Sequence, residues 1–142
     1  VGSCRLYLGA KDFQQTVVIR QMVRDLNMET AVRVMPIVRE KDGLAMSSRN
    51  RYLSAGERTR ALAISKVLGE MKRRFLGGEI PVGRLKTWGL QMLKKSIDRV
   101  QYLEIVDPRT LVPVRRVQPE MAVLVACFVG KTRLIDNAII KI

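Results

Sequence analysis

The spacing of apolar residues divides the first 50 residues into a strand, a helix and a second strand. Residues 6–8 are mostly apolar and lead into a turn at residues 9–10, which is typical of a short strand. From about residue 12 to residue 27 the apolar side chains recur at helical spacing, at Ile19, Met22, Val23 and Leu26. Residues 31–38 are rich in β-branched side chains and predict the second strand. A strand–helix–strand unit with short links implies a parallel sheet.

This first unit lacks the neighbours that a parallel sheet requires. A sheet of two strands is marginally stable at best, and parallel strands are normally covered on both faces. We therefore expect residues 1–50 to be the closing unit of a larger doubly wound sheet whose earlier strands are absent. At the start of the helix, Asp12 and Gln15 have the spacing of an N-cap residue and a box-like partner.

Residues 51–142 show the pattern of a second unit, which begins with two helices. Ser54 and Glu57 have the spacing of a capping box and predict the start of a long helix, which ends at Gly77-Gly78. One face of this helix is apolar, at Ala61, Ile64, Leu68, Met71 and Phe75. A second helix is predicted over about residues 82–97.

Three strand-like runs follow the helices, at residues 100–106, 121–129 and 133–140. Gly130-Lys131 joins the last two runs and predicts a tight hairpin turn. Two helices with a small antiparallel sheet make an α+β unit separate from the first. The predicted domains are therefore residues 1–50 and residues 51–142.

Charge and composition narrow the classes of partner. The chain has 26 basic and 13 acidic residues, a net charge of +13, which indicates anionic partners. The basic residues are spread along the chain, and aromatic residues, at 5%, do not interleave with them as base-stacking platforms would. This pattern favours a generally basic surface over a nucleic-acid partner. The apolar content of 47% excludes a disordered tail.

Cysteine and histidine usage limits the chemistry further. Cys4 and Cys127 lack metal-ligand spacing and lie in apolar contexts, so both are predicted to be buried free thiols in a cytoplasmic, reducing environment. No apolar run is long enough for a membrane-spanning helix. The chain has no histidine, so neither a Ser/His/Asp nor a Cys/His nucleophile arrangement is possible.

Two short motifs carry the candidate chemistry. Gly9-Ala10-Lys11-Asp12 joins an apolar run to a helix start, where free N–H groups favour anions. Met46-Ser47-Ser48-Arg49 is a cluster of hydroxyls and a guanidinium that can hold a polyphosphate. In this order and at this spacing the motifs resemble pantothenate synthetase, a ligase that joins pantoate to β-alanine with ATP. The resemblance covers roughly the second half of that family's chain.

The resemblance implies a role for each site residue. Gly9 and Ala10 let the nucleotide approach the backbone, Lys11 contacts ATP phosphate, and Asp12 accepts hydrogen bonds from the ribose hydroxyls. Gln15 binds pantoate, and Gln14 is its neighbour in the sequence. The backbone of Val38 contacts adenine. The loop that closes over the triphosphate comprises Met46, Ser47, Ser48 and Arg49.

The family's wider superfamily has a lysine in this loop where the present chain has Ala45. The catalytic group is expected to be Lys11, Ser47, Ser48 and Arg49. Mg²⁺ is expected to accompany ATP, bound mainly by phosphates and waters, since no carboxylate cage is evident. Asp136-Asn137 also matches the family and is interpreted as a structural pair that closes the small sheet.

The fold implied is α/β: the closing strand–helix–strand unit of a Rossmann-like nucleotidyltransferase domain, followed by a small α+β lid domain. The function implied is part of a ligase that adenylates pantoate and condenses it with β-alanine. We expect the chain alone to be inactive, because the family's His-x-Gly-His motif and the other wall of the pantoate pocket are missing. Its partners would be the N-terminal half and, when complete, a second copy. The alternative is a non-catalytic basic module that binds nucleotide or RNA.

Overall fold

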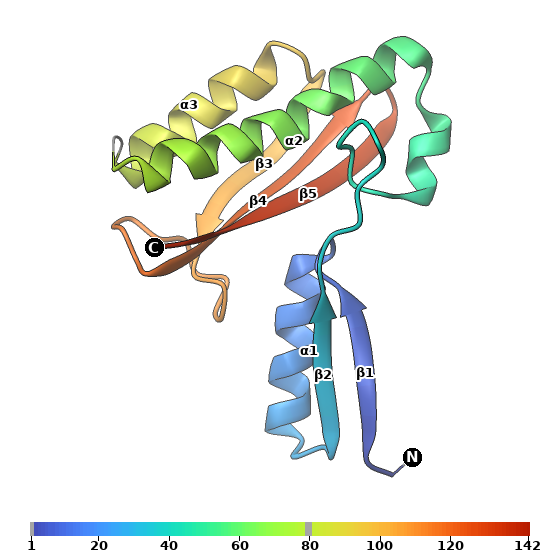
Figure 1. Ribbon diagram of the computed structural model, residues 1–142, viewed down its shortest axis with the longest axis vertical. Helices are drawn as coiled ribbons and strands as arrows, with labels where there is room; N and C mark the ends of the chain where they lie inside the picture. Colours follow the sequence, from blue (N-terminus) through green and yellow to red (C-terminus); the bar gives the residue numbers. More distant parts are fainter. Residues whose placement is uncertain (1, 79–80) are drawn as a thin grey trace.

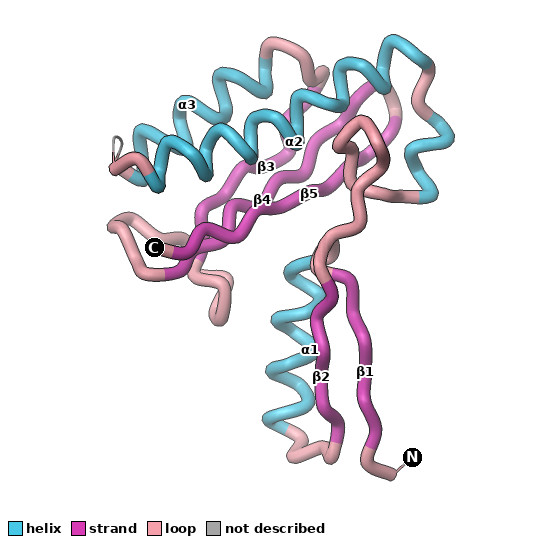
Figure 2. The backbone as a smooth tube through the Cα atoms, in the orientation of Figure 1, coloured by secondary structure: helices cyan, strands magenta, loops and turns pink. Residues whose placement is uncertain are grey.

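The computed structural model describes residues 2–78 and 81–142 and places them in two parts, joined by an irregular segment (Figure 1; Figure 2). The first part contains β1 (Cys4–Gly9), α1 (Phe13–Asp25) and β2 (Thr30–Met35). β1 and β2 pair in parallel, from Cys4 opposite Thr30 to Gly9 opposite Met35. α1 lies against one face of this two-stranded sheet (Figure 1). The predicted βαβ unit is confirmed.

Three details of the first part differ from the sequence-based expectation. β2 ends at Met35 and not near residue 38, because Pro36 has no N–H to donate to a strand ladder. α1 ends at Asp25, and Asn27 adopts a left-handed φ of 46°, a conformation that stops a helix. Asp12 precedes α1 but makes no side-chain cap hydrogen bond, so the predicted box with Gln15 is wrong. The Asp12 side chain lies instead along a cavity described below.

The second part is a helical layer on a three-stranded sheet. A short 3-10 helix, η1 (Ser48–Tyr52), leads into α2 (Ala55–Leu76), which is followed by α3 (Val82–Lys94). The sheet contains β3 (Arg99–Val106), β4 (Glu120–Val129) and β5 (Thr132–Lys141), antiparallel in the order β3-β4-β5. α2 and α3 lie side by side over one face of it (Figure 1).

Local signals place these elements where the sequence predicts them. The Ser54–Glu57 capping box is formed in both directions, and α2 begins at the next residue after Ser54. Gly130 adopts a positive φ of 56° in the β4–β5 turn, as a tight hairpin requires. The predicted apolar face of α2 is buried against the sheet.

The two cysteines have different environments. Cys127 is fully buried in the core of the second part, as predicted. Cys4 is exposed, which contradicts the prediction, because β1 has a strand neighbour on one side alone within the described residues. Of the helices in residues 2–78 and 81–142, none is both long and apolar enough to cross a membrane.

Candidate functional site

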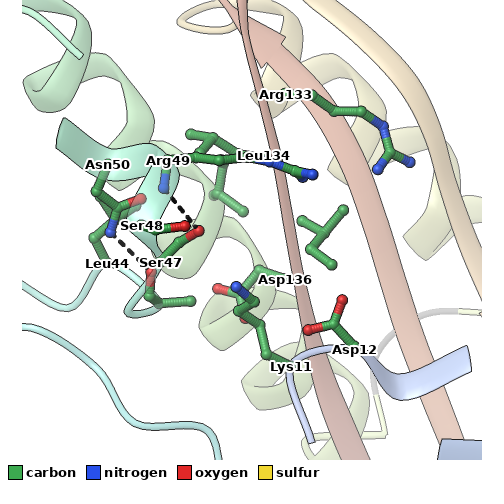
Figure 3. A pocket seen from close by; sticks show the side chains of 13 residues that line it. Lys11, Asp12, Leu44, Ser47, Ser48, Arg49, Asn50, Arg133, Leu134 and Asp136 are labelled. Atoms are coloured by element: carbon green, nitrogen blue, oxygen red, sulfur yellow. Dashed lines mark hydrogen bonds between the residues drawn. The ribbon is translucent and has the colours of Figure 1, made fainter. Parts of the chain in front are cut away.

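The turn between β1 and α1 and the segment that leads into η1 meet against β5, where they line a cavity of about 190 Å³ (Figure 3). Lys11 and Asp12 come from the turn, Ser47, Ser48 and Arg49 from the segment, and Arg133 and Asp136 from β5. Residues far apart in the sequence thus surround one space. The groups that face it include ammonium, guanidinium, hydroxyl and carboxylate groups.

A short hairpin after β2 positions the segment that carries the hydroxyls. The Met46 amide donates to the Val38 carbonyl at 2.9 Å, and Arg39 and Ala45 form an antiparallel bridge. Gly43 has a φ of 94°, which favours glycine at this tight turn. The hairpin, residues 38–46, therefore fixes the position at which the next residue, Ser47, lines the cavity.

Side-chain hydrogen bonds and ion pairs connect this hairpin to η1 and to α2. Arg58 forms ion pairs with Glu40 at 2.5 Å and with Asp42 at 2.7 Å. Asn50 donates to the Glu40 carboxylate at 2.6 Å and to the Ala45 carbonyl at 3.0 Å. Hydrogen bonds from Asn50 and then Arg58 hold the pKa of Glu40 below its usual value, because they favour the charged form. The hairpin is thereby fixed to the second part of the molecule.

The start of η1 is capped by Ser47. The Ser47 hydroxyl accepts a hydrogen bond from the Arg49 amide at 3.3 Å (Figure 3). Across the cavity, the Lys11 ammonium reaches the Met46 carbonyl at 3.4 Å, a contact between residues 35 apart in the sequence. The two predicted motifs are therefore direct neighbours in space.

Arg133 is a third cation at this cavity, and the sequence analysis missed it. Its Nε donates to Gln101 Oε1 at 2.9 Å, which orients the guanidinium through a neutral partner. Within the described residues no ion pair joins it to a carboxylate. Lys11, Arg49 and Arg133 together make the cavity attractive to a polyanion. No motif or spacing in the sequence marks Arg133 as distinct from other arginines.

A second cavity, of about 200 Å³, adjoins the first. Lys11, Asp12 and Arg133 line both cavities, whereas Gln14 and Gln15 line the second one alone. The predicted pantoate residue therefore lies beside the predicted phosphate residues, in a separate pocket. This arrangement suits two ligands that must react with each other.

β5 contributes two buried polar residues to the junction. Asp136 forms a bidentate pair with Arg39, at 2.7 and 3.0 Å. The Asn137 side-chain amide donates to the carbonyls of Ala10 and Lys11, at 2.8 and 3.1 Å. The interpretation that this pair closes the small sheet is incomplete, since the Asn137 side chain bonds the turn of the first part and the Asp136 side chain bonds Arg39 of the hairpin. In the sequence, the sign that these residues have polar partners elsewhere in the fold was their position as two adjacent polar residues in a largely apolar strand.

The remaining predicted residues, Gly9, Ala10, Val38 and Met46, line neither of the two cavities. Gly9 is the last residue of β1, and the Ala10 amide donates to the Met35 carbonyl at 2.8 Å. Val38 and Met46 are exposed, 62% and 56% respectively. No group of three or more Cys, Asp or Glu side chains within the described ranges could hold a metal ion.

A sequence model of pantoate–beta-alanine ligases matches residues 1–139. The chain belongs to this family. A pantothenate synthetase from Clostridium novyi is 47% identical over 139 residues, which cover 97% of this chain and 49% of that protein. Another, from a Sulfurihydrogenibium species, is 50% identical over 134 residues, 93% of this chain and 48% of that protein.

Solved structures of the family have the same fold. The pantothenate synthetase of Thermus thermophilus superposes with a TM-score of 0.88 at 40% identity, covering 94% of this chain and 49% of that one. The pantoate–beta-alanine ligase of Francisella tularensis, complexed with beta-gamma ATP and beta-alanine, has a TM-score of 0.64 at 28% identity, over 94% and 42% of the two chains. The chain thus spans about half the length of the relatives it matches.

Proposed function

We propose that this chain supplies one half of the active site of an ATP-dependent ligase that adenylates pantoate and joins it to β-alanine, releasing AMP and pyrophosphate. The observation that carries the proposal is the convergence of Lys11, Ser47, Ser48, Arg49 and Arg133 on one cavity in a member of this ligase family. The Francisella relative, which is complexed with an ATP derivative and β-alanine, supports the choice of ligands.

The first cavity would hold the triphosphate. In the first step the pantoate carboxylate attacks the α-phosphate, and pyrophosphate leaves with the bonding electron pair. Lys11, Arg49 and Arg133 offset the negative charge that develops there, and the Ser47 and Ser48 hydroxyls donate hydrogen bonds. Mg²⁺ enters with ATP as part of the substrate, held by phosphate oxygens and waters.

The neighbouring groups would orient the nucleotide and pantoate. Asp12 accepts from the ribose hydroxyls, the Val38 backbone contacts adenine, and the Gly9-Ala10 backbone lets the nucleotide come close. Gln15 donates to pantoate from the second cavity, where a neutral amide adds no buried charge. In the second step the β-alanine amine attacks the acyl carbon and AMP leaves.

The other half of the site would come from the portion that the relatives have in addition. We propose that this portion extends the β1–β2 sheet, supplies the second wall of the pantoate pocket, and forms most of a homodimer contact. The chain alone would then show no turnover. Two unpaired cysteines suit a cytoplasmic enzyme.

The test uses the complete enzyme, which is this chain joined to the portion that its relatives have. Lys11→Ala and Arg49→Ala should each slow adenylation, by about 2–4 kcal/mol of activation free energy if they match lost oxyanion donors. Gln15→Ala should raise the pantoate KM and leave the ATP KM near its wild-type value. Lys72→Ala is the matched control, since Lys72 is an exposed cation on α2 outside both cavities.

A second function has one observation in its favour, the net charge of +13. A non-catalytic module for RNA would bind single strands with a steep dependence on salt concentration. The ligase half would bind Mg²⁺–ATP selectively at moderate salt. Titrating the chain with both ligands at several salt concentrations separates the two, and tight RNA binding without ATP binding would overturn the ligase proposal.

A further inference from the structure

The adjacent residues Asp136 and Asn137 on β5 connect three segments of the site. Asn137 donates both N–H groups of its side-chain amide to the turn, at 2.8 Å to the Ala10 carbonyl and 3.1 Å to the Lys11 carbonyl. Asp136 binds Arg39, whose Nη1 also donates to the Gly43 carbonyl at 3.1 Å within the hairpin. The Asp136 carboxylate also accepts a hydrogen bond from the backbone N–H of Asn137 at 2.8 Å.

We propose that Asp136 and Asn137 are positioning residues, which set the β1–α1 turn and the 38–46 hairpin at one fixed separation for adenylation. This inference rests on the proposed function for its catalytic consequence. Neither residue needs to touch substrate. They act through Lys11 on one side and through Arg39 and the hairpin on the other.

Burial makes these hydrogen bonds selective for one arrangement. Asp136 and Asn137 are each 4% exposed, in a strand whose other buried residues are apolar. A buried amide or carboxylate without partners costs considerable free energy, and water cannot readily replace a lost partner there. A shift of β5 relative to the turn would leave both side-chain N–H groups of Asn137 and the carbonyls of Ala10 and Lys11 without hydrogen-bond partners at the same time. The bonded arrangement is therefore favoured over slightly displaced ones.

The bonded arrangement determines where the charged groups lie. The carbonyl held by Asn137 belongs to Lys11 itself, so its backbone cannot rotate freely while the ammonium faces the cavity. On the other side, Arg39 lies at the base of the hairpin that leads to Ser47. One dipeptide thus controls the distance between the two sets of phosphate-facing groups. Misplacement of reacting groups by about 1 Å can cost on the order of 100-fold in rate.

A purely structural role would predict something different. Loss of the contacts would then lower the melting temperature, while the molecules that remain folded would turn over normally. A positioning role predicts that fully folded enzyme is slow. It also predicts that backbone amides of the turn exchange their hydrogens faster in the variants, even in the absence of any ligand.

The experiment compares Asn137→Ala and Asn137→Ser with wild type in the complete enzyme, below the melting temperature of each. Asn137→Ala removes both donors, and Asn137→Ser retains one hydroxyl donor. Arg39→Lys, which keeps the charge but loses the bidentate geometry, tests the hairpin side and serves if Asn137 variants fold poorly. Gln21→Ala is the matched control, since the Gln21 side-chain amide donates to the Asp25 carboxylate at 2.6 Å within α1 and lines neither cavity.

Two readouts are measured. Hydrogen exchange without ligand follows the Ala10 amide, bonded to the Met35 carbonyl, and the Met46 amide, bonded to the Val38 carbonyl. Steady-state kinetics follow kcat and the KM values for ATP and pantoate. We expect Asn137→Ala to speed Ala10 exchange at least tenfold and to lower kcat by roughly 10- to 100-fold. Asn137→Ser should restore part of the slow Ala10 exchange and part of kcat. Arg39→Lys should speed exchange of the Met46 amide more than exchange of the Ala10 amide.

Each outcome decides the inference. A wild-type kcat in folded Asn137→Ala or Arg39→Lys would overturn the inference. Exchange of the Ala10 amide in Asn137→Ala that is no faster than in Gln21→Ala would also overturn it. If wild-type complete enzyme fails to bind ATP, the proposed function is wrong. In that case the exchange data still decide whether Asn137 holds the turn.

Discussion

The two parts of this molecule use apolar residues in opposite ways. In residues 2–38 Thr16 is the one residue that is buried, and apolar side chains such as Tyr7, Val18 and Leu26 are more than half exposed. In the second part α2, α3 and the sheet enclose a continuous core. The second part therefore buries its apolar side chains within itself, whereas the first part leaves apolar surface that other strands and helices could cover.

Topology explains this difference. β3, β4 and β5 pair antiparallel, two of them through a tight turn, and two helices cover one face. β1 and β2 are parallel strands with one helix, and parallel sheets are stable when both faces are covered. The relatives are about twice as long as this chain, which is enough additional sequence for strands and helices that would cover both faces of such a sheet.

Separating the two parts should give the largest effect. We expect residues 39–142 to unfold cooperatively, because Leu44 packs in the core and Arg39 pairs with Asp136 within that fragment. Residues 1–38 should be unfolded or associate through exposed apolar surface. Circular dichroism and hydrogen exchange measure both. A cooperative transition in the 1–38 monomer would contradict the comparison.

The two thiols should react at very different rates. Cys4 is exposed, whereas Cys127 is fully buried, and burial raises the pKa of the Cys127 thiol to about 12. Since the thiolate is the nucleophile, Cys127 should be alkylated orders of magnitude more slowly than Cys4 at pH 8. Mass spectrometry after timed labelling measures this, and denaturant should equalise the rates. Rapid labelling of native Cys127 would show that the second part opens easily.

The contact of α3 with α2 and the sheet should be sensitive to volume. A Cβ on Gly89 would lie 2.6 Å from Met71 Sδ and 2.8 Å from Leu103 Cδ2. Gly89→Ala should therefore destabilise by about 1–3 kcal/mol, the usual cost of overpacking. Gly83→Ala, in the same helix with open space around it, should stabilise by up to about 1 kcal/mol. Equal effects of the two substitutions in urea unfolding would argue against close packing at Gly89.

Loss of the α2 capping box should have a smaller effect. Ser54→Ala removes the side-chain acceptor for the Glu57 amide and should cost about 1 kcal/mol in unfolding free energy. Ser54→Asp, which keeps an acceptor, should lose much less. Chemical denaturation of residues 39–142 measures both, and an unchanged midpoint for Ser54→Ala would contradict the role of the cap.

The acid dependence of the second part should include a modest contribution from Glu70. Hydrogen bonds from Arg73 and then Arg74 lower the pKa of Glu70 from 4.5 to about 2. Because the folded pKa is depressed, the stabilisation is present above pH 4.5 and is lost as pH falls towards 2. Glu70→Gln should flatten the slope of stability against pH in that window. An unchanged slope would show that these exposed pairs contribute nothing measurable.

Local signals account for the parts of the fold that were predicted well. The Ser54–Glu57 box, Gly77-Gly78 and Gly130-Lys131 each act over a few residues, and α2 and the β4–β5 hairpin form where they indicate. Several of the errors lie in the first part. Cys4 was expected to be buried because its sequence is apolar, but within the described residues β1 pairs with β2 alone, and Cys4 is exposed.

The sequence by itself determined the order and type of the elements, and through family resemblance it pointed to Lys11 and to residues 46–49. What only the tertiary structure decided is the junction: Arg133 beside Lys11 and Arg49, and Asn137 on the turn. Asn137 and Ala10 are 127 residues apart, and Arg39 and Asp136 are 97 apart. Periodicity and capping are properties of neighbours along the chain, so they hold no information about which polar groups meet across such separations.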